Sequence, residues 1–251
     1  MQNSKYTIAT SDFYQTIMAR ALGVDEQDTL VAGQPRNDLM YKKNHCLENL
    51  NLNGNKEKSI ILWTPTYRQS IIGDVRVDGV HTNDLPVVKS GELQELNRFL
   101  QTINSYMLIK LHPMDILNNN EFSDYSNMQI IKKDGLEACN CQLYSVLGEI
   151  DVLLTDFSSI YIDYLLLNHP IGFVVDDFSE YSNSRGFIFD NPEEYMPGNK
   201  ISTFDELKDF LHSTIVLKQD SYIVERQEVN QKFNKEFDNY SEELLKAIGF
   251  V

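Results

Sequence analysis

The sequence is short of positive charge: 22 lysines and arginines stand against 37 aspartates and glutamates, which gives a net charge of −15. A surface this acidic argues against a protein that binds nucleic acid chiefly by charge, because such proteins neutralise phosphates with lysine and arginine. It also makes direct docking on anionic lipid unfavourable. We therefore expect no nucleic-acid partner.

Cysteine is scarce as well. The three residues are Cys46, Cys139 and Cys141. The single-residue gap between the last two is too short for a usual zinc-binding pair, and no second pair completes four ligands. No disulfide framework is implied, so we expect free thiols in a reducing, cytoplasmic compartment. Neither a metal ion nor a cofactor is expected.

Long apolar runs are also missing. The opening residues, MQNSKYTIATSD, lack the apolar core of a secretory signal. No run approaches the roughly 20 apolar residues of a membrane-spanning helix. The hydrophobic content of 42% is nevertheless enough for a sizeable core, in one large domain or one domain plus part of another.

Short β-rich runs alternate with helical patterns along the chain. Several of the runs are continuously apolar, which is typical of a parallel sheet covered by helices on both faces. The pattern predicts an α/β fold with a Rossmann-like, doubly wound parallel sheet. The expected strands are residues 6–10, 29–33, 59–65, 106–113, 128–133, 151–156 and 171–175. The expected helices are residues 12–23 (ending at Gly23), 90–103, 141–150, 158–168 and 202–215, with one or two charged helices in the last ~30 residues.

One polar segment marks a candidate domain boundary. Residues 42–58, KKNHCLENLNLNGNKEK, are polar and are expected to form a linker or an exposed helix and loop. Residues 1–41 hold only a strand–helix–strand, which is too little for a core of its own. They are interpreted as the remnant of another domain or as an extra strand pair laid against the main sheet. Residues 59–251 are expected to form the main domain.

Polar residues follow the ends of the predicted strands. Asp156 ends one strand, and Ser158 and Ser159 then begin the next helix. Ligands of open parallel sheets bind beyond the carboxyl ends of the strands, and a helix start with free N–H groups suits a phosphate. The alternative is that Ser158 only caps the helix.

Further strand ends supply more candidates. LIKLHP places His112 at the same edge, where it can donate to a phosphate or protonate a leaving oxygen, although a lone histidine there is more often structural. LWTPTYRQS supplies Thr64 and Arg68, and Arg68 either holds a phosphate or forms a surface ion pair. Arg36, in AGQPRND, and Arg185, in SNSRGF, are weaker candidates. For Arg36 the alternative is that its stretch only forms a turn, built by Gly33 and Pro35. For Arg185 the alternative is that the charges of its loop serve solubility.

Five stretches, in their order along the chain, resemble the CDP-glycerol glycerophosphotransferase family of teichoic-acid primases and polymerases. They are GQPRND, ILWTPTYR, LIKLHP, DVLLTDFSSIYIDYLLLNHPIGF and RGFIFDNPEEYMPG. The resemblance runs from about Tyr6 to about Ile248. It implies a glycosyltransferase-B-type architecture with two Rossmann-like halves around a cleft. This chain would be mainly the C-terminal half, which binds the nucleotide donor.

The resemblance also assigns residues. It implies that His112 is catalytic and contacts the donor diphosphate. It places Thr64, Arg68, Asp156, Ser158 and Ser159 in the donor cleft, and together with Arg36 and Arg185 from the reading of the residues these are the substrate-binding candidates. Phe157 stands where the family usually has a tyrosine.

The implied reaction transfers glycerol phosphate, or a related polyol phosphate, from a CDP-activated donor to a polymer or lipid-linked acceptor of the cell wall or capsule. Such a chain would be cytoplasmic, and peripheral at the inner face of the membrane. The family's first half carries a His-Gly motif whose histidine resembles a general base, and this sequence contains no His-Gly. Catalysis by this chain alone is therefore left open, and a separate chain is one source of the acceptor half.

Two alternatives remain. One is a nucleotide-sugar glycosyltransferase on the same fold, because fold does not determine donor chemistry. The other is a non-catalytic module that binds a nucleotide or a partner protein.

Overall fold

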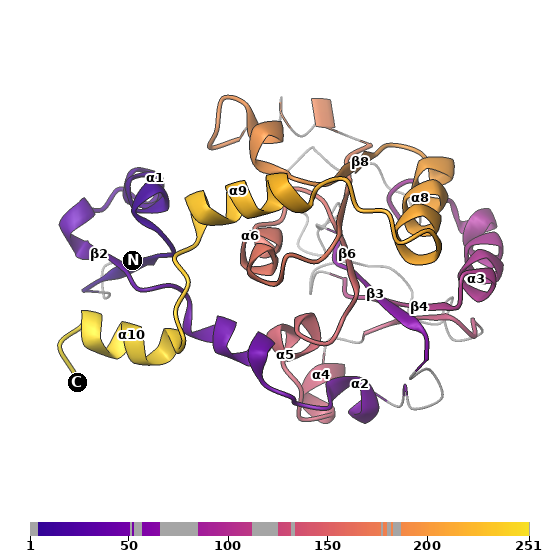
Figure 1. Ribbon diagram of the computed structural model, residues 1–251, viewed down its shortest axis with the longest axis horizontal. Helices are drawn as coiled ribbons and strands as arrows, with labels where there is room; N and C mark the ends of the chain where they lie inside the picture. Colours follow the sequence, from indigo (N-terminus) through magenta and orange to yellow (C-terminus); the bar gives the residue numbers. More distant parts are fainter. Residues whose placement is uncertain are drawn as a thin grey trace, which may run out of the picture.

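The computed structural model describes residues 5–50, 52, 57–65, 85–111, 125–131, 134–176, 178–179, 182 and 187–250. Its centre is a six-stranded sheet in the order β5-β4-β3-β6-β7-β8, with every neighbouring pair parallel (Figure 1). The strands are β3 (Ser59–Trp63), β4 (Ser105–Ile109), β5 (Met128–Ile130), β6 (Val152–Thr155), β7 (Ile171–Val174) and β8 (Asn199–Ile201). The Rossmann-like, doubly wound prediction is confirmed.

Helices cover both faces of this sheet, which explains why its strands are continuously apolar. Ile60 and Leu62 of β3 lie in one buried cluster, and Ile61 and Trp63 lie in another on the opposite face. The first cluster packs against α5 (Leu143–Leu147), α6 (Ile160–Tyr164) and α9 (Ile223–Phe233). The second packs against α3 (Leu93–Thr102) and α8 (Phe204–Leu211).

Local signals placed several helix ends correctly. Helix α1 (Asp12–Leu22) begins at Ser11, whose hydroxyl accepts from the amide of Tyr14, and ends at Gly23 with φ of 66°. Thr203 caps α8 in the same way. The expected helix 158–168 is α6 followed by a 3₁₀ turn over Leu165–Leu167. Strand β8 was not expected.

The first residues form a separate unit. Strands β1 (Thr7–Ala9) and β2 (Thr29–Val31) pair in parallel as a two-stranded sheet outside the central one. A 3₁₀ segment, η2 (Pro35–Tyr41), follows β2. A turn precedes Arg36 here, because Gly33 has φ of 66° and Pro35 occupies the first position of η2.

The end of the chain returns to this unit. Helices α9 and α10 (Tyr240–Ala247) run back from the central sheet, so that both termini lie at the same end of the molecule (Figure 1). The amide of Lys235 donates to the carbonyl of Thr10 at 2.7 Å. The carboxylate of Asp38 accepts from the amide of Tyr240 at 2.7 Å and from that of Ser241 at 3.0 Å.

The segment expected to be a linker is packed where it is described. Helix α2 (Cys46–Asn49) begins at the carboxylate of Glu149, which accepts from the amides of Cys46 and Leu47, both at 3.0 Å. Cys46 and Leu52 are buried in the first cluster. Burial is the main cause that raises the pKa of the Cys46 thiol, to about 12, so this cysteine is a core residue rather than a nucleophile.

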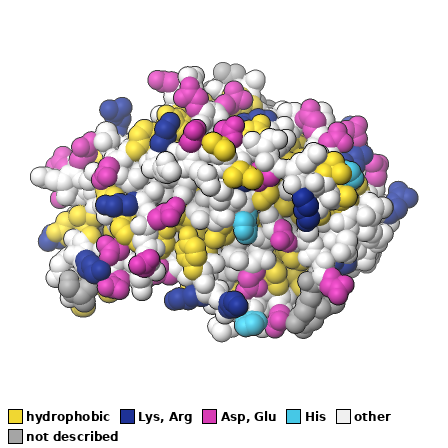
Figure 2. All heavy atoms as spheres, in the orientation of Figure 1, with side chains coloured by type: hydrophobic (Ala, Val, Ile, Leu, Met, Phe, Trp, Pro, Cys, Tyr) yellow, Lys and Arg dark blue, Asp and Glu magenta, His cyan; other side chains and the backbone are white. Residues whose placement is uncertain are grey.

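The surface carries the acidic excess without a single concentrated patch on the face viewed in Figure 2, where acidic side chains are scattered among basic ones. Among the described residues, no helix is long and apolar enough to cross a bilayer. The same ranges contain no group of three or more histidine, cysteine or acidic side chains arranged to hold a metal ion.

Candidate functional site

The candidate site lies where the strand order reverses. The chain builds β3, β4 and β5 in one direction and then returns beside β3 with β6, so β3 and β6 meet at a topological switch point. Ligands of such sheets bind at the carboxyl ends of the two strands that meet there. Thr64 follows β3, and Thr155 and Asp156 close β6.

Two threonines join these strand ends. The amide of Thr64 donates to the carbonyl of Leu154 at 2.8 Å, and its hydroxyl lies 3.2 Å from the hydroxyl of Thr155. Both threonines are buried. The pair fixes the end of β3 against the end of β6, and so it sets the position of the turn that begins at Asp156.

The turn after β6 presents two serine hydroxyls that have no hydrogen-bond partner in the part of the chain that the structure describes. Asp156 is only 1% exposed, and its Oδ1 accepts from the amide of Ser158 at 3.2 Å. Ser159 is the N-cap of α6, but it has φ of −66° and ψ of −3° and makes no side-chain cap bond. Neither serine hydroxyl hydrogen-bonds any residue in the described ranges. The alternative in which Ser158 only caps the helix is therefore wrong.

Phe157, in the same turn, packs against the first buried cluster. Its ring lies 5.8 Å from that of Phe178 and 5.4 Å from that of Phe187. These are tilted, edge-on contacts of the kind that aromatic rings favour. A phenylalanine at the position where the family usually has a tyrosine thus fits an apolar aromatic cluster.

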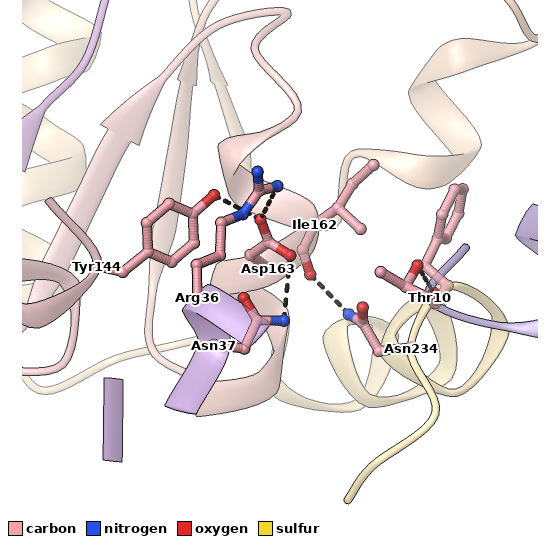
Figure 3. A network of polar contacts seen from close by, with 8 residues as sticks. Thr10, Arg36, Asn37, Tyr144, Ile162, Asp163 and Asn234 are labelled. Atoms are coloured by element: carbon pink, nitrogen blue, oxygen red, sulfur yellow. Dashed lines mark hydrogen bonds and ion pairs between the residues drawn. The ribbon is translucent and has the colours of Figure 1, made fainter. Parts of the chain in front are cut away.

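The buried carboxylate of Asp163, one turn along α6, accepts hydrogen bonds from the neighbouring segments η2 and α5 (Figure 3). Asp163, 2% exposed, accepts from Nη2 of Arg36 at 2.8 Å, from Nδ2 of Asn37 at 3.2 Å and from the hydroxyl of Tyr144 at 2.6 Å. The Arg36 guanidinium also stacks 4.8 Å above the Tyr144 ring. Burial, together with the charge and hydrogen bond of Asp163, raises the pKa of Tyr144, so the phenol remains a donor.

Sequence reasoning missed Asp163 and Tyr144. The available signal was a single carboxylate inside the apolar stretch SSIYIDYLLLN, since buried acids are rare unless paired. Tyr161, Tyr164, Leu165 and Leu167, on the same stretch, serve packing, because all four lie in or against the first buried cluster.

The structure therefore brings Thr64, Asp156, Ser158 and Ser159 together at one edge of the sheet and places Arg36 on α6 through Asp163. His112, Arg68 and Arg185 lie outside the described residues. Hydroxyls and the amides at a helix start are donors that suit phosphate oxygens, and an arginine adds charge.

The chain also matches known proteins. The profile of the family described as CDP-Glycerol:Poly(glycerophosphate) glycerophosphotransferase matches residues 1–248. A teichoic acid poly(glycerol phosphate) polymerase of Bacillus spizizenii is 30% identical over 216 residues, which is 84% of this chain and 51% of that protein. A teichoic acid glycerol-phosphate primase of Bacillus subtilis is 30% identical over 196 residues, covering 77% of this chain and 45% of that protein.

Solved structures agree on the fold. The wall teichoic acid polymerase TagF superposes with a TM-score of 0.71 at 22% identity, covering 98% of this chain and 57% of that one. S. aureus MnaA, solved with UDP, superposes with a TM-score of 0.54 at 11% identity over 99% of this chain and 62% of its own. These likenesses show a glycosyltransferase-B-type, Rossmann-like fold. This chain spans about half the length of these two curated relatives. With the family profile covering nearly the whole sequence, the chain belongs to the CDP-glycerol:poly(glycerophosphate) glycerophosphotransferase family.

Proposed function

We propose that this chain binds the CDP-activated donor for a transferase that moves glycerol phosphate, or a related polyol phosphate, onto a cell-wall or capsular polymer. The observation that carries the proposal is the polar turn at the switch point of a family fold. Asp156 is buried there, and the hydroxyls of Ser158 and Ser159 have no partner among the described residues.

The chemistry would proceed by phosphoryl transfer. An acceptor hydroxyl attacks the β-phosphorus of the donor, its proton passes to a base, and CMP leaves with the electron pair of the broken phosphorus–oxygen bond. Negative charge grows on the departing phosphate. Serine hydroxyls fixed at the strand ends stabilise that charge without reorganising, and we assign the same role to His112, with Arg68 and Arg185 as further phosphate contacts.

Thr64 contributes differently. Its hydroxyl and amide are engaged with the end of β6. We therefore assign it the task of holding the two strand ends at the spacing that the diphosphate requires, in addition to any contact with the ligand.

The polyol is the least determined part of the donor. The relatives include proteins named for poly(glycerol phosphate) and others named for ribitol phosphate, such as the S. aureus polymerase TarL at 26% identity. CDP-glycerol and CDP-ribitol are thus the two donors to compare.

A second candidate is a binding module without catalysis of its own. It is favoured by one observation, the lack of any His-Gly dipeptide in the sequence. In that case the acceptor half and its general base lie outside residues 1–251. We place either form in the cytoplasm at the inner face of the membrane, brought there by a polymer or lipid-linked acceptor, since direct docking of an acidic surface on anionic lipid is unfavourable.

Calorimetric titration tests the proposal. We expect the full chain to bind CDP-glycerol or CDP-ribitol more tightly than CMP, and not to bind UDP or UDP-sugars. Preference for a UDP-sugar would instead identify a glycosyltransferase, and binding of no nucleotide would refute a donor site. Adding a purified acceptor and measuring CMP release separates an active enzyme from a binding module.

A further inference from the structure

Arg36 is held in place by two neighbours before any ligand arrives. One guanidinium nitrogen is bound by Asp163 at 2.8 Å, and the guanidinium stacks 4.8 Å above the Tyr144 ring. The side chain is still 48% exposed. Within the described residues the guanidinium makes one hydrogen bond, from Nη2 to Asp163, so its remaining N–H donors are available to a ligand.

Asp163, which holds Arg36, is itself held by three hydrogen-bond donors. Asp163 accepts from Arg36 and Asn37 of η2 and from Tyr144 of α5 while it stands on α6 (Figure 3). A buried carboxylate is costly unless it is paired and hydrogen-bonded. This one meets both conditions, and its oxygens accept from all three donors at 2.6–3.2 Å.

The same carboxylate places Arg36 near the candidate site. Asp163 lies four positions after Ser159 on α6, and residues four apart share one face of a helix about one turn apart. The carboxylate that anchors the guanidinium is therefore on the side of the helix that begins with the exposed Ser159, about one turn further along.

Close packing makes this arrangement rigid. A side chain added at Gly148, at the end of α5, would come within 2.1 Å of the carbonyl oxygen of Met40 in η2. Asn37 and Met40 are themselves buried. The segment that carries Arg36 thus has little freedom to move relative to α5, and the position of the arginine is determined before binding.

We propose that Asp163 is a positioning residue that, with the Tyr144 ring, holds Arg36 ready to bind a phosphate group of the nucleotide donor. This inference rests on the proposed donor-binding function. Asp163 touches no ligand in this arrangement, since its oxygens face Arg36, Asn37 and Tyr144. Its contribution to binding passes through the arginine.

A double-mutant cycle tests it, with the full chain titrated calorimetrically with CDP-glycerol. Arg36→Gln is expected to weaken binding roughly 10- to 150-fold, the usual loss for a hydrogen bond to a charged group. Asp163→Asn is expected to weaken binding in the wild-type background and to have no further effect when Arg36 is already glutamine. A merely structural residue would cause the same loss in both backgrounds.

Two further variants keep the test decisive. Arg36→Lys retains the charge but loses the planar fork, so it is expected to fold normally and still bind less tightly. Asp38→Asn is the matched control, because Asp38 is a carboxylate of the same segment that holds α10 instead of α6. It is expected to lower the urea midpoint and leave the affinity unchanged.

The outcomes separate the two proposals. If the wild type binds CDP-glycerol and both Arg36 variants bind it equally well, the inference is overturned and the proposed function stands. Equal losses from Asp163→Asn in the two backgrounds also overturn it. Failure of the wild type to bind any CDP-polyol overturns both.

Discussion

The sharpest prediction concerns the serines of the turn after β6. In the described residues their hydroxyls have no partner, and Ser159 makes no cap bond although it is the N-cap of α6. Replacing a serine that does cap a helix costs about 1 kcal/mol of stability. Here Ser158→Ala, Ser159→Ala and the double variant are expected to change the free energy of unfolding by less than about 0.5 kcal/mol, as surface substitutions do.

The affinity for CDP-glycerol, in contrast, should fall strongly in these variants. A hydrogen bond to a charged group contributes about 1.5–3 kcal/mol, so each alanine is expected to weaken CDP-glycerol binding roughly 10- to 150-fold. Calorimetric titration gives the affinity, and urea unfolding followed by circular dichroism gives the stability. Ser241→Ala is a suitable control, because its hydroxyl is committed to Asp38.

A single result would refute the reasoning. If the double variant lost about 1–2 kcal/mol of stability and bound CDP-glycerol as tightly as the wild type, the serines would be structural. The anion site would then have to lie elsewhere.

Three other predictions concern stability and follow from single contacts. Gly148→Ala should destabilise the protein by roughly 1–3 kcal/mol in urea unfolding, because the new methyl group would meet the Met40 backbone rather than a movable side chain; an unchanged midpoint would contradict the close approach. Arg226→Met should cost roughly 3–5 kcal/mol, since Arg226 is 1% exposed and its loss leaves Asp220 unpaired. Burial alone raises the pKa of Asp220, but the hydrogen bond and charge of Arg226 outweigh it and hold that pKa below its ordinary value. The stability gap between the wild type and Asp220→Asn should thus be full above about pH 4 and shrink as the pH falls further, as acid titration of unfolding would show.

The elements that sequence reasoning found are those whose cause is local. Gly23 ends α1 because a left-handed residue is needed there, and Thr203 begins α8 with its own side chain. The central strands stand out because both faces are buried. Strand β8 was missed because Asn199 and Lys200 are polar, and its pairing is supplied by the backbone of β7 at the edge of the sheet.

The site was predictable only in part, for the same reason. Asp156, Ser158 and Ser159 are consecutive along one strand–turn–helix, so their proximity follows from the chain itself. The contacts of Asp163 join residues 127 and 19 positions apart. No spacing rule links Arg36, Tyr144 and Asp163, because the packing of η2 and α5 on α6 brings them together.

The return of the last helices to the first strands has a consequence for synthesis. The hydroxyl of Ser11 donates to the carbonyl of Lys232 at 2.6 Å, and the carboxylate of Asp38 accepts from the amides that begin α10. During translation the opening strand–helix–strand leaves the ribosome long before those partners exist. It must remain undocked on that side until the carboxyl-terminal helices emerge, so a nascent chain halted just before residue 223 should display this first unit to proteases and chaperones even after the central sheet has formed.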